Sequence, residues 1–243
     1  MDAVVLDLED AVGPKEKESA RDAVRGWLAE KPPGRMAVVR INPLTGDHGV
    51  ADLKVAAGAD ALLLPKVEGA ADLTAARLLA GSKPLWAMIE TPAAVLHVAE
   101  IAAGAAALMM GANDLLKDMG GRQRPDRTNL HYAMAALVTA ARAHDCLALD
   151  ATWNDISDAA GFAADCALGR DFGFDGKTLI HPSQIEPARA AFAPSAEDIA
   201  EAQALLDEFD KPENRNKGVI AFRGRMVERL HAELARRLLD EGA

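Results

Sequence analysis

Short apolar runs, each followed by a stretch with helical periodicity, repeat along almost the whole chain and constrain its fold more than any other feature. The runs lack a regular alternation of polar and apolar residues, which is typical of strands covered on both faces of a parallel sheet. Seven strands are predicted, at residues 3–8, 36–41, 61–64, 85–89, 107–110, 146–149 and 178–180. Strands that alternate with helices imply right-handed βαβ units and an α/β fold.

Helices are expected between these strands and beyond the last of them. The amphipathic stretches that predict helices against the sheet are residues 15–29, 71–80, 93–103, 129–144 and 155–168. After residue 183 the expected elements are helices at 185–192 and 196–209, a charged linker at 211–217, a short strand at 219–222 and a helix at 225–239. We therefore predict a catalytic barrel domain at 1–192 and a C-terminal helical lid at 193–243.

The alternation and the length of 243 residues favour a TIM (β/α)8 barrel. Such a barrel closes with eight strands, whereas the sequence supplies seven and opens directly on the first of them. Four explanations stay open: the first barrel strand is missing from this chain, the sheet is open, another segment fills the gap, or a weak strand escapes detection.

Charge and composition exclude several classes of protein. The formal net charge of −10 argues against a nucleic-acid partner, because phosphate binding needs a basic surface, although a local arginine can still bind a small anion. Neither a charge-free apolar run of about 18 residues nor a signal-peptide pattern is present, so we expect no membrane span and a cytoplasmic location. Cys146 and Cys166 lie in apolar contexts and are expected to be buried thiols.

Polar residues directly follow nearly every predicted strand. Barrel enzymes carry their chemistry at the carboxyl ends of the strands, so these residues form the candidate site. Glu90 and Asp114 follow neighbouring strands, and two converging carboxylates completed by water suit a hard cation such as Mg²⁺. No His/Cys cluster has the spacing of a zinc site. For each carboxylate, a helix N-cap or a surface ion pair is the alternative role.

Arg40 lies inside a buried run and needs a partner, because an unpaired buried charge is unfavourable. The partner is either a substrate carboxylate, bound through two parallel hydrogen bonds, or an acidic side chain at the end of the first strand. That strand end carries an acidic cluster with basic residues nearby in the sequence, namely Asp7, Glu9, Asp10, Lys17 and Arg21. We favour a role for the cluster in orienting metal ligands over direct ligation.

Two features near the last predicted strand are ambiguous. The glycine-rich segment 173–177 lacks the spacing of a Walker loop, and a tight turn is the simplest interpretation. His181 ends the strand and precedes Pro182, where a lone histidine fits a structural role as well as a functional one.

Together, these residues resemble the citrate lyase β-subunit-like family, part of the HpcH/HpaI aldolase/citrate lyase superfamily, which includes malyl-CoA and citramalyl-CoA lyases. The matching blocks are collinear and span almost the whole chain. They are DLEDAV (7–12) with Lys17 and Arg21, VRIN (39–42), LPKVE (64–68), IET (89–91), GANDL (111–115), GFDGKTLIHPSQI (173–185) and GRMVE with the following LH (224–231).

The resemblance implies a TIM barrel that binds Mg²⁺ and a CoA or carrier-protein thioester. The metal ligands that it implies are Glu90 and Asp114. The substrate-binding residues that it suggests are Arg40, Glu9, Asp10 and Lys17, with Arg40 also catalytic. Members of the family cleave a 3-hydroxy-3-carboxyacyl thioester to a 2-oxoacid and a shorter acyl thioester, and hydrolytic relatives are thioesterases. A homotrimer or hexamer is expected on the same ground.

Two departures from the family pattern bear on these expectations. Family members usually begin with a strand that ends in a Phe-Val-Pro-Gly-like block, and this chain starts at Met1 without it, which accounts for the seven strands. In the family's lyases, an aspartate of the C-terminal lid reaches the active site of a neighbouring subunit, and the matching residue here is Glu228. Its carboxylate is a candidate for catalytic proton transfer, with a purely structural lid as the alternative.

Three functions therefore compete. The leading hypothesis is a Mg²⁺-dependent lyase for a malyl-CoA, citramalyl-CoA or citryl thioester, because Mg²⁺ and Arg40 can stabilise the charge that develops on cleavage. The second is a class II aldolase that uses the same metal on free 2-oxo-4-hydroxy acids without CoA. The third is a non-catalytic metabolite-binding or assembly subunit.

Overall fold

The structure, a computed structural model, describes residues 3–241. These residues form two compact units that divide between Ile185 and Glu186. The predicted domain boundary after residue 192 differs from this division only in the assignment of the helix Ile185–Phe192. The catalytic and lid roles of the two parts stay a prediction.

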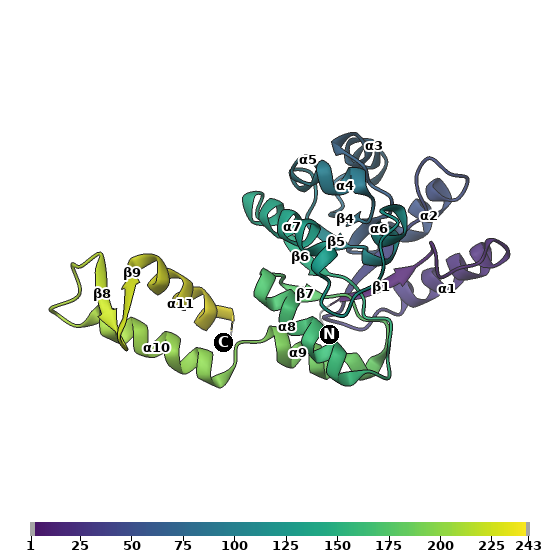
Figure 1. Ribbon diagram of the computed structural model, residues 1–243. Helices are drawn as coiled ribbons and strands as arrows, with labels where there is room; N and C mark the ends of the chain where they lie inside the picture. Colours follow the sequence, from purple (N-terminus) through teal and green to yellow (C-terminus); the bar gives the residue numbers. More distant parts are fainter. Residues whose placement is uncertain (1–2, 242–243) are drawn as a thin grey trace. The chain divides into compact units, whose positions relative to one another are not determined.

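A parallel sheet of seven strands forms the centre of the first unit (Figure 1). The strands are β1 (Ala3–Asp7), β2 (Met36–Arg40), β3 (Ala61–Leu64), β4 (Leu85–Ile89), β5 (Ala107–Met110), β6 (Leu147–Asp150) and β7 (Gly176–Lys177). They pair in chain order, so that β1 and β7 are the edge strands of the described sheet. The predicted α/β fold is confirmed, as a curled, TIM-barrel-like sheet with seven strands among the described residues.

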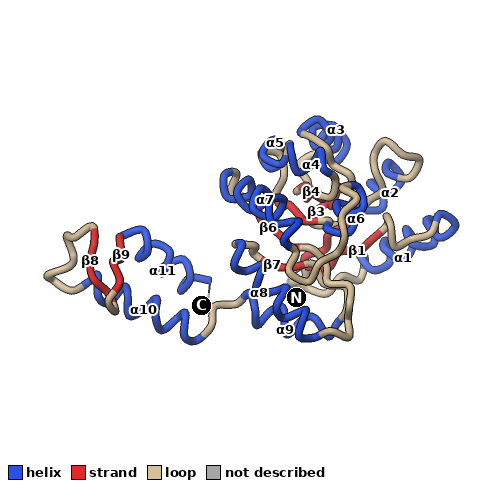
Figure 2. The backbone as a smooth tube through the Cα atoms, in the orientation of Figure 1, coloured by secondary structure: helices blue, strands red, loops and turns tan. Residues whose placement is uncertain are grey.

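The helices of this unit surround the sheet (Figure 2). They are α1 (Lys17–Ala29), α2 (Gly49–Val55), α3 (Ala70–Ala80), α4 (Pro92–Leu96), α5 (Val98–Ala102), α6 (Ala112–Asp118), α7 (His131–Ala143) and α8 (Ala159–Phe172). The sequence pattern does not predict α2 or α6, because helices this short barely show a helical period. No helix within residues 3–241 is long and apolar enough to cross a membrane.

Two predicted helices have different boundaries in the structure. The helix expected at 93–103 is interrupted at His97 and becomes α4 and α5. The helix expected at 155–168 begins only at Ala159, because the side chain of Asp158 accepts a hydrogen bond from the main-chain N–H of Gly161 and caps α8 there.

The last strand of the sheet lies before the segment predicted for it. The strand predicted at 178–180 is wrong, because β7 lies at Gly176–Lys177 and pairs with the end of β6. The turn expected at 173–177 is present only before Gly176, with Gly173 at φ 93°. The prediction followed the apolar residues, yet Ile180 is 53 % exposed. Lys177 is the fully buried side chain of this segment, and it is buried through ion pairs rather than apolar contacts.

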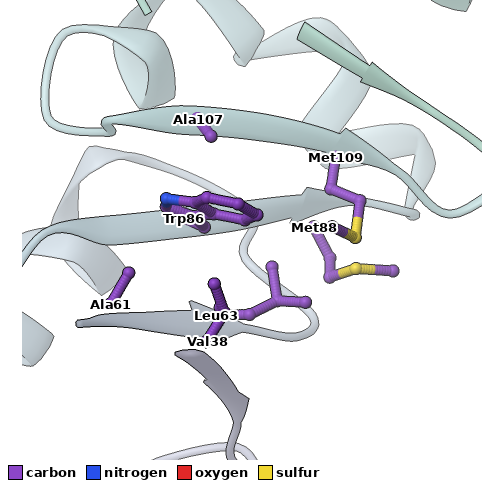
Figure 3. Close-up of a cluster of buried hydrophobic side chains, with 7 residues drawn as sticks. All are labelled: Val38, Ala61, Leu63, Trp86, Met88, Ala107 and Met109. Atoms are coloured by element: carbon purple, nitrogen blue, oxygen red, sulfur yellow. The ribbon is translucent and has the colours of Figure 1, made fainter. Parts of the chain in front are cut away.

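An apolar cluster covers one face of the sheet (Figure 3). Its buried members are Val38, Ala61, Leu63, Trp86, Met88, Ala107 and Met109. The strand register places Trp86 beside Leu63 and Ala107, and Met88 beside Met109, so alternate residues of neighbouring strands share this face. Burial of each larger side chain contributes about 1.5–3 kcal/mol to stability.

The second unit contains helices and a β-hairpin. Its elements are α9 (Ile185–Phe192), α10 (Ala196–Asp210), β8 (Val219–Phe222), β9 (Arg225–Glu228) and α11 (Arg229–Glu241). Phe209 of α10 is buried in a cluster with Ala232 and Ala235 of α11. The predicted strand 219–222 is confirmed, but the helix predicted from residue 225 is wrong over its start. Arg223 and Gly224 have φ of 47° and 78°, which makes a two-residue hairpin turn between β8 and β9.

Candidate active site

A pocket of about 500 Å³ lies at the carboxyl ends of the strands in the first unit. Its charged lining residues are Asp7, Asp10, Arg40, Glu90 and Asp114. Its apolar lining includes Val5, Leu63, Met88 and Met109 from the strands themselves. Most of the predicted site residues are therefore brought together at one rim, as expected for parallel strands that end side by side.

Glu90 and Asp114 reach this pocket from neighbouring parts of the sheet. Glu90 directly follows β4 and is 1 % exposed, whereas Asp114 lies in the first turn of α6. Asp114 does not cap that helix, because Gly111 is the N-cap residue. Burial raises the pKa of Glu90 above its ordinary value. The two carboxylates thus differ in environment, although both face the same space.

Lys66 joins the two carboxylates. Its main-chain N–H donates to Oε1 of Glu90 at 2.7 Å, and its ammonium contacts Asp114 and lies 3.5 Å from the same Glu90 oxygen. The hydrogen bond from this ammonium holds the pKa of Asp114 below its ordinary range. Sequence reasoning placed Lys66 at a strand end without a role, because the contact depends on its left-handed backbone, with φ of 52°.

The donor set at this point suits magnesium. Two carboxylates within contact of one ammonium show that a single cation can be shared by Glu90 and Asp114. Within residues 3–241, no group of three His, Cys, Asp or Glu side chains gathers as a closed metal site would require. A hard ion that keeps water or substrate oxygens in its other positions fits this arrangement better than a structural zinc ion. Metal ligation by these two residues stays a prediction.

Arg40 has acidic partners within the protein. Its Nε donates to Oδ1 of Asp7 at 2.7 Å, and its Nη1 lies 3.1 Å from Oε2 of Glu9. Burial opposes the ionised form of Asp7, but the hydrogen bonds and charge of Arg40, together with main-chain N–H donors of Glu9 and Ala11, outweigh it and lower the pKa of Asp7. Burial raises the pKa of Glu9 to about 7. Arg40 also lines the pocket, so these ion pairs leave its predicted substrate contact open.

Lys17 lies outside the pocket lining in the described structure. Its ammonium donates to the carbonyls of Leu8 and Glu9 at 2.7 and 2.8 Å, and to Oδ1 of Asn42 at 2.9 Å. Two of these hydrogen bonds therefore support the backbone at the acidic cluster, and the third holds the side chain of Asn42. Asp10 does line the pocket, whereas Glu9 is buried behind it. Substrate contact by Lys17 and Glu9 stays a prediction, for which the structure offers an indirect role.

Two further candidates have local structural contacts. His181 caps a short 3-10 helix, because its Nδ1 accepts a hydrogen bond from the main-chain N–H of Ser183 at 3.2 Å. Glu228 belongs to the second unit, at the end of β9, and its main-chain N–H donates to Nδ1 of His231 at 3.0 Å. A catalytic role for Glu228 stays a prediction.

Sequence reasoning gave no specific role to the wall of the pocket that follows β6 and β7, although Asn154 is a polar residue near the end of a predicted strand. The wall consists of Thr152, Asn154, Thr178 and Ile180. These are small polar and apolar residues in loops, so no pattern of charge or periodicity marks them. Lys177, a charged residue beside a predicted strand, was another available signal.

Comparison with known proteins decides the family. The model of the HpcH/HpaI aldolase/citrate lyase family matches residues 1–182. The chain belongs to this family. A (3S)-malyl-CoA thioesterase of Cereibacter sphaeroides is 44 % identical over 243 residues, which cover 98 % of this chain and 85 % of that protein. A citrate lyase subunit beta of Haemophilus influenzae is 32 % identical over 256 residues, which cover 98 % and 88 % of the two chains.

Solved structures extend the likeness to the fold. CitE from Mycobacterium tuberculosis, in complex with magnesium, acetoacetate and coenzyme A, is 34 % identical with a TM-score of 0.85, covering 99 % of this chain and 90 % of that chain. A citrate lyase beta subunit of M. tuberculosis, complexed with oxaloacetate and magnesium, is 36 % identical with a TM-score of 0.70, covering 79 % and 87 %. The predicted family and lyase class are confirmed, and the predicted magnesium agrees with these solved relatives.

Proposed function

We propose that this lyase uses magnesium to cleave a 3-hydroxy-3-carboxyacyl-CoA of the malyl-CoA or citramalyl-CoA type, giving a 2-oxoacid and a shorter acyl-CoA. The observation that carries the proposal is the convergence of Glu90 and Asp114, with Arg40 on the same rim of a pocket of about 500 Å³. The relatives support the substrate class, since one is named for malyl-CoA and another was solved with coenzyme A.

Glu90 and Asp114 would hold the magnesium ion, which supplies Lewis acidity towards the substrate hydroxyl and carboxylate oxygens when it is bound. The main-chain N–H of Lys66 keeps one carboxylate oxygen of Glu90 in a fixed direction. Gly111 leaves the space that Glu90 needs, because a Cβ at residue 111 would lie 2.3 Å from the Cβ of Glu90. The backbone around the two carboxylates therefore supports one arrangement of them.

Arg40 supplies positive charge beside the reacting atoms. Asp7 and Glu9 hold its guanidinium in place, so its orientation is fixed before a substrate carboxylate binds. Its charge then stabilises the oxyanion that develops on cleavage.

Glu228 is our candidate for proton transfer at the thioester enolate, acting from a neighbouring subunit. This role requires the expected homotrimer or hexamer, which light scattering of the purified protein would detect.

Thioester hydrolysis is the second candidate activity, because the relative with 44 % identity is named a thioesterase. Both activities can start from the same bound substrate, but their products differ. Hydrolysis releases free coenzyme A, whereas carbon–carbon cleavage releases a 2-oxoacid and leaves the thioester intact. The class II aldolase alternative predicts turnover of free 2-oxo-4-hydroxy acids and none of acyl-CoAs.

The test incubates the purified protein and Mg²⁺ with malyl-CoA, citramalyl-CoA and a free 4-hydroxy-2-oxoacid, and measures free thiol and 2-oxoacid separately. We expect oxoacid release from an acyl-CoA, abolished by EDTA and by Asp114→Asn. Asp118→Asn, on the same helix but exposed, is the matched control and should leave activity unchanged. Full activity in the presence of EDTA and in Asp114→Asn would refute the proposal.

A further inference from the structure

We propose that Gln184 is a positioning residue of the active site. It fixes the two loops that follow β6 and β7 and form one wall of the pocket. The effect on substrate turnover rests on the proposed function, whereas the effect on the loops does not. Gln184 is 3 % exposed and lies outside the lining of the pocket, so it acts through other residues.

The amide of Gln184 bridges the loop after β6 and the loop after β7. Its Oε1 accepts the main-chain N–H of Ile180 at 3.0 Å, and its Nε2 donates to the main-chain carbonyl of Trp153 at 3.0 Å. One partner is a donor and the other an acceptor, so only one orientation of the amide satisfies both. A buried side chain paired at both ends is a rigid link between the two loops.

These two loops carry the wall of the pocket. Thr152 and Asn154 flank Trp153, and Thr178 precedes Ile180 by two residues. Thr152, Asn154, Thr178 and Ile180 line the pocket, whereas Trp153 does not. The amide of Asn154 donates to Oδ1 of Asn113 at 2.8 Å. Asn113 directly precedes Asp114, so the wall that Gln184 fixes is hydrogen-bonded to the chain neighbour of a candidate metal ligand.

The strand ends below these loops are fixed independently. Arg127 and Lys177 alternate with Asp150 and Asp165 in a closed ring of buried ion pairs, with Arg127 Nη1 to Asp150 Oδ1 at 2.7 Å. Lys177 also donates to the carbonyl of Ala151 at 2.5 Å. The ring therefore anchors the start of both loops, and Gln184 provides a second anchor nearer their middle. The ring and Gln184 together determine the spacing between the two loops, whereas the ring alone would let the loops rotate about their starting points.

This arrangement predicts a defect in substrate positioning rather than in metal binding. Gln184 bonds to Ile180 and Trp153 rather than to Glu90 or Asp114, so loss of the bridge should leave Mg²⁺ affinity within about twofold. A small displacement of the wall can nevertheless lower turnover by up to about 10²-fold. We expect kcat/KM to fall about tenfold or more, mainly through a higher KM, because the displaced residues contact the substrate before and during the reaction.

The experiment compares Gln184→Met and Gln184→Glu with the wild-type chain. Met removes both hydrogen bonds at similar volume, and Glu retains the acceptor for Ile180 while losing the donor to Trp153. Gln203→Met, on the exposed face of α10, is the matched control. Native-state hydrogen exchange of peptides 151–156 and 178–184 is the first readout, and it needs no substrate. We expect faster exchange in these peptides in both variants, with the exchange of the other strand ends unchanged.

The second readout is steady-state kinetics together with calorimetric Mg²⁺ binding. Unchanged exchange in both peptides, or unchanged kcat and KM in variants of an active wild type, would overturn the positioning role. A fall in the amount of folded protein with normal KM in the folded fraction would show a purely structural role and would also overturn it. Should Gln184→Met not fold, Gln184→Glu decides by the same readouts. An inactive wild type with the expected exchange pattern would contradict the proposed function alone.

Discussion

The main-chain N–H of Lys66 donates to Oε1 of Glu90 at 2.7 Å, while the ammonium of the same lysine contacts Asp114. One residue thus holds both candidate metal carboxylates, through two different groups. It does so with a left-handed backbone, φ 52°, which costs a non-glycine residue about 1–2 kcal/mol. The hydrogen bond to buried Glu90 offsets part of that strain, so the backbone and the site stabilise one another.

Removal of the Lys66 ammonium should tighten Mg²⁺ binding. The ammonium and the metal compete for the same carboxylate oxygens, and loss of a neighbouring positive charge favours a divalent cation. Lys66→Met and Lys66→Gly should each lower the Kd about threefold or more, which corresponds to about 0.7 kcal/mol. Glycine also tolerates the positive φ and keeps the N–H that Glu90 accepts. Titration calorimetry at low ionic strength measures this, and unchanged or weaker binding in both variants would contradict competition.

Substitution of Gly111 should disturb Glu90 directly. A Cβ at residue 111 would lie 2.3 Å from the Cβ of Glu90 and 2.8 Å from its Oε2, so Glu90 or the backbone must move. Gly111→Ala should lower the free energy of unfolding by about 1–3 kcal/mol and weaken Mg²⁺ binding. Gly26→Ala, inside α1 with no atom within 4 Å of the new Cβ, should instead stabilise the chain by about 0.5–1 kcal/mol. Urea denaturation of both variants checks the contrast.

The rim positions of Glu90, Asp114 and Arg40 could be predicted from the sequence, because Glu90 and Asp114 follow buried apolar runs and Arg40 lies within one. Parallel strands end on one rim, so their convergence followed from the fold class. The contact between the main-chain N–H of Lys66 and Glu90 could not be predicted in this way, since it accompanies a left-handed backbone that the residue type does not indicate.

Sequence reasoning misplaced two strands for which apolar periodicity was a poor guide. β7 was missed because Lys177 is buried by ion pairs, and a search for apolar runs passes over it. The start of β9 was missed because an Arg-Gly hairpin turn is a weaker signal than Asn-Gly, while the residues after it have helical periodicity. The wall residues after β6 have no periodicity at all.

Glu9→Gln should change the pH dependence of stability. Burial raises the pKa of Glu9 from 4.5 to about 7, so between these values the folded chain binds more protons than the unfolded chain. The contribution of Glu9 to stability is therefore lost as pH rises through this window. Between pH 5 and pH 8, the free energy of unfolding of Glu9→Gln should gain on the order of 2–3 kcal/mol relative to wild type. Urea denaturation at several pH values measures the difference.

Asp7→Asn supplies a control of opposite sign. The pKa of Asp7 is lowered because the hydrogen bonds and charge of Arg40, with two main-chain N–H donors, together outweigh burial. Its stabilising effect is therefore present above the ordinary pKa of 3.8 and is lost as pH falls. The variant should be destabilised by on the order of 2 kcal/mol near neutral pH, and the deficit should shrink towards pH 3. A deficit in Asp7→Asn that grows with acidity, or a stability difference in Glu9→Gln that stays flat, would contradict these assignments.

The buried ring of ion pairs should respond more strongly to one substitution than to two. Lys177→Met removes one cation from the pair of carboxylates Asp150 and Asp165, whose side chains are 0 and 2 % exposed. The uncompensated buried charge should cost about 3–5 kcal/mol of unfolding free energy. In the double variant Lys177→Met with Asp165→Leu, the ion pair between Arg127 and Asp150 remains and the charge balances again. The double variant should therefore be more stable than Lys177→Met alone. The double-mutant cycle should give a coupling energy of at least about 1 kcal/mol. Additive losses would show that the ring is not a coupled unit and would contradict its role as an anchor of the strand ends.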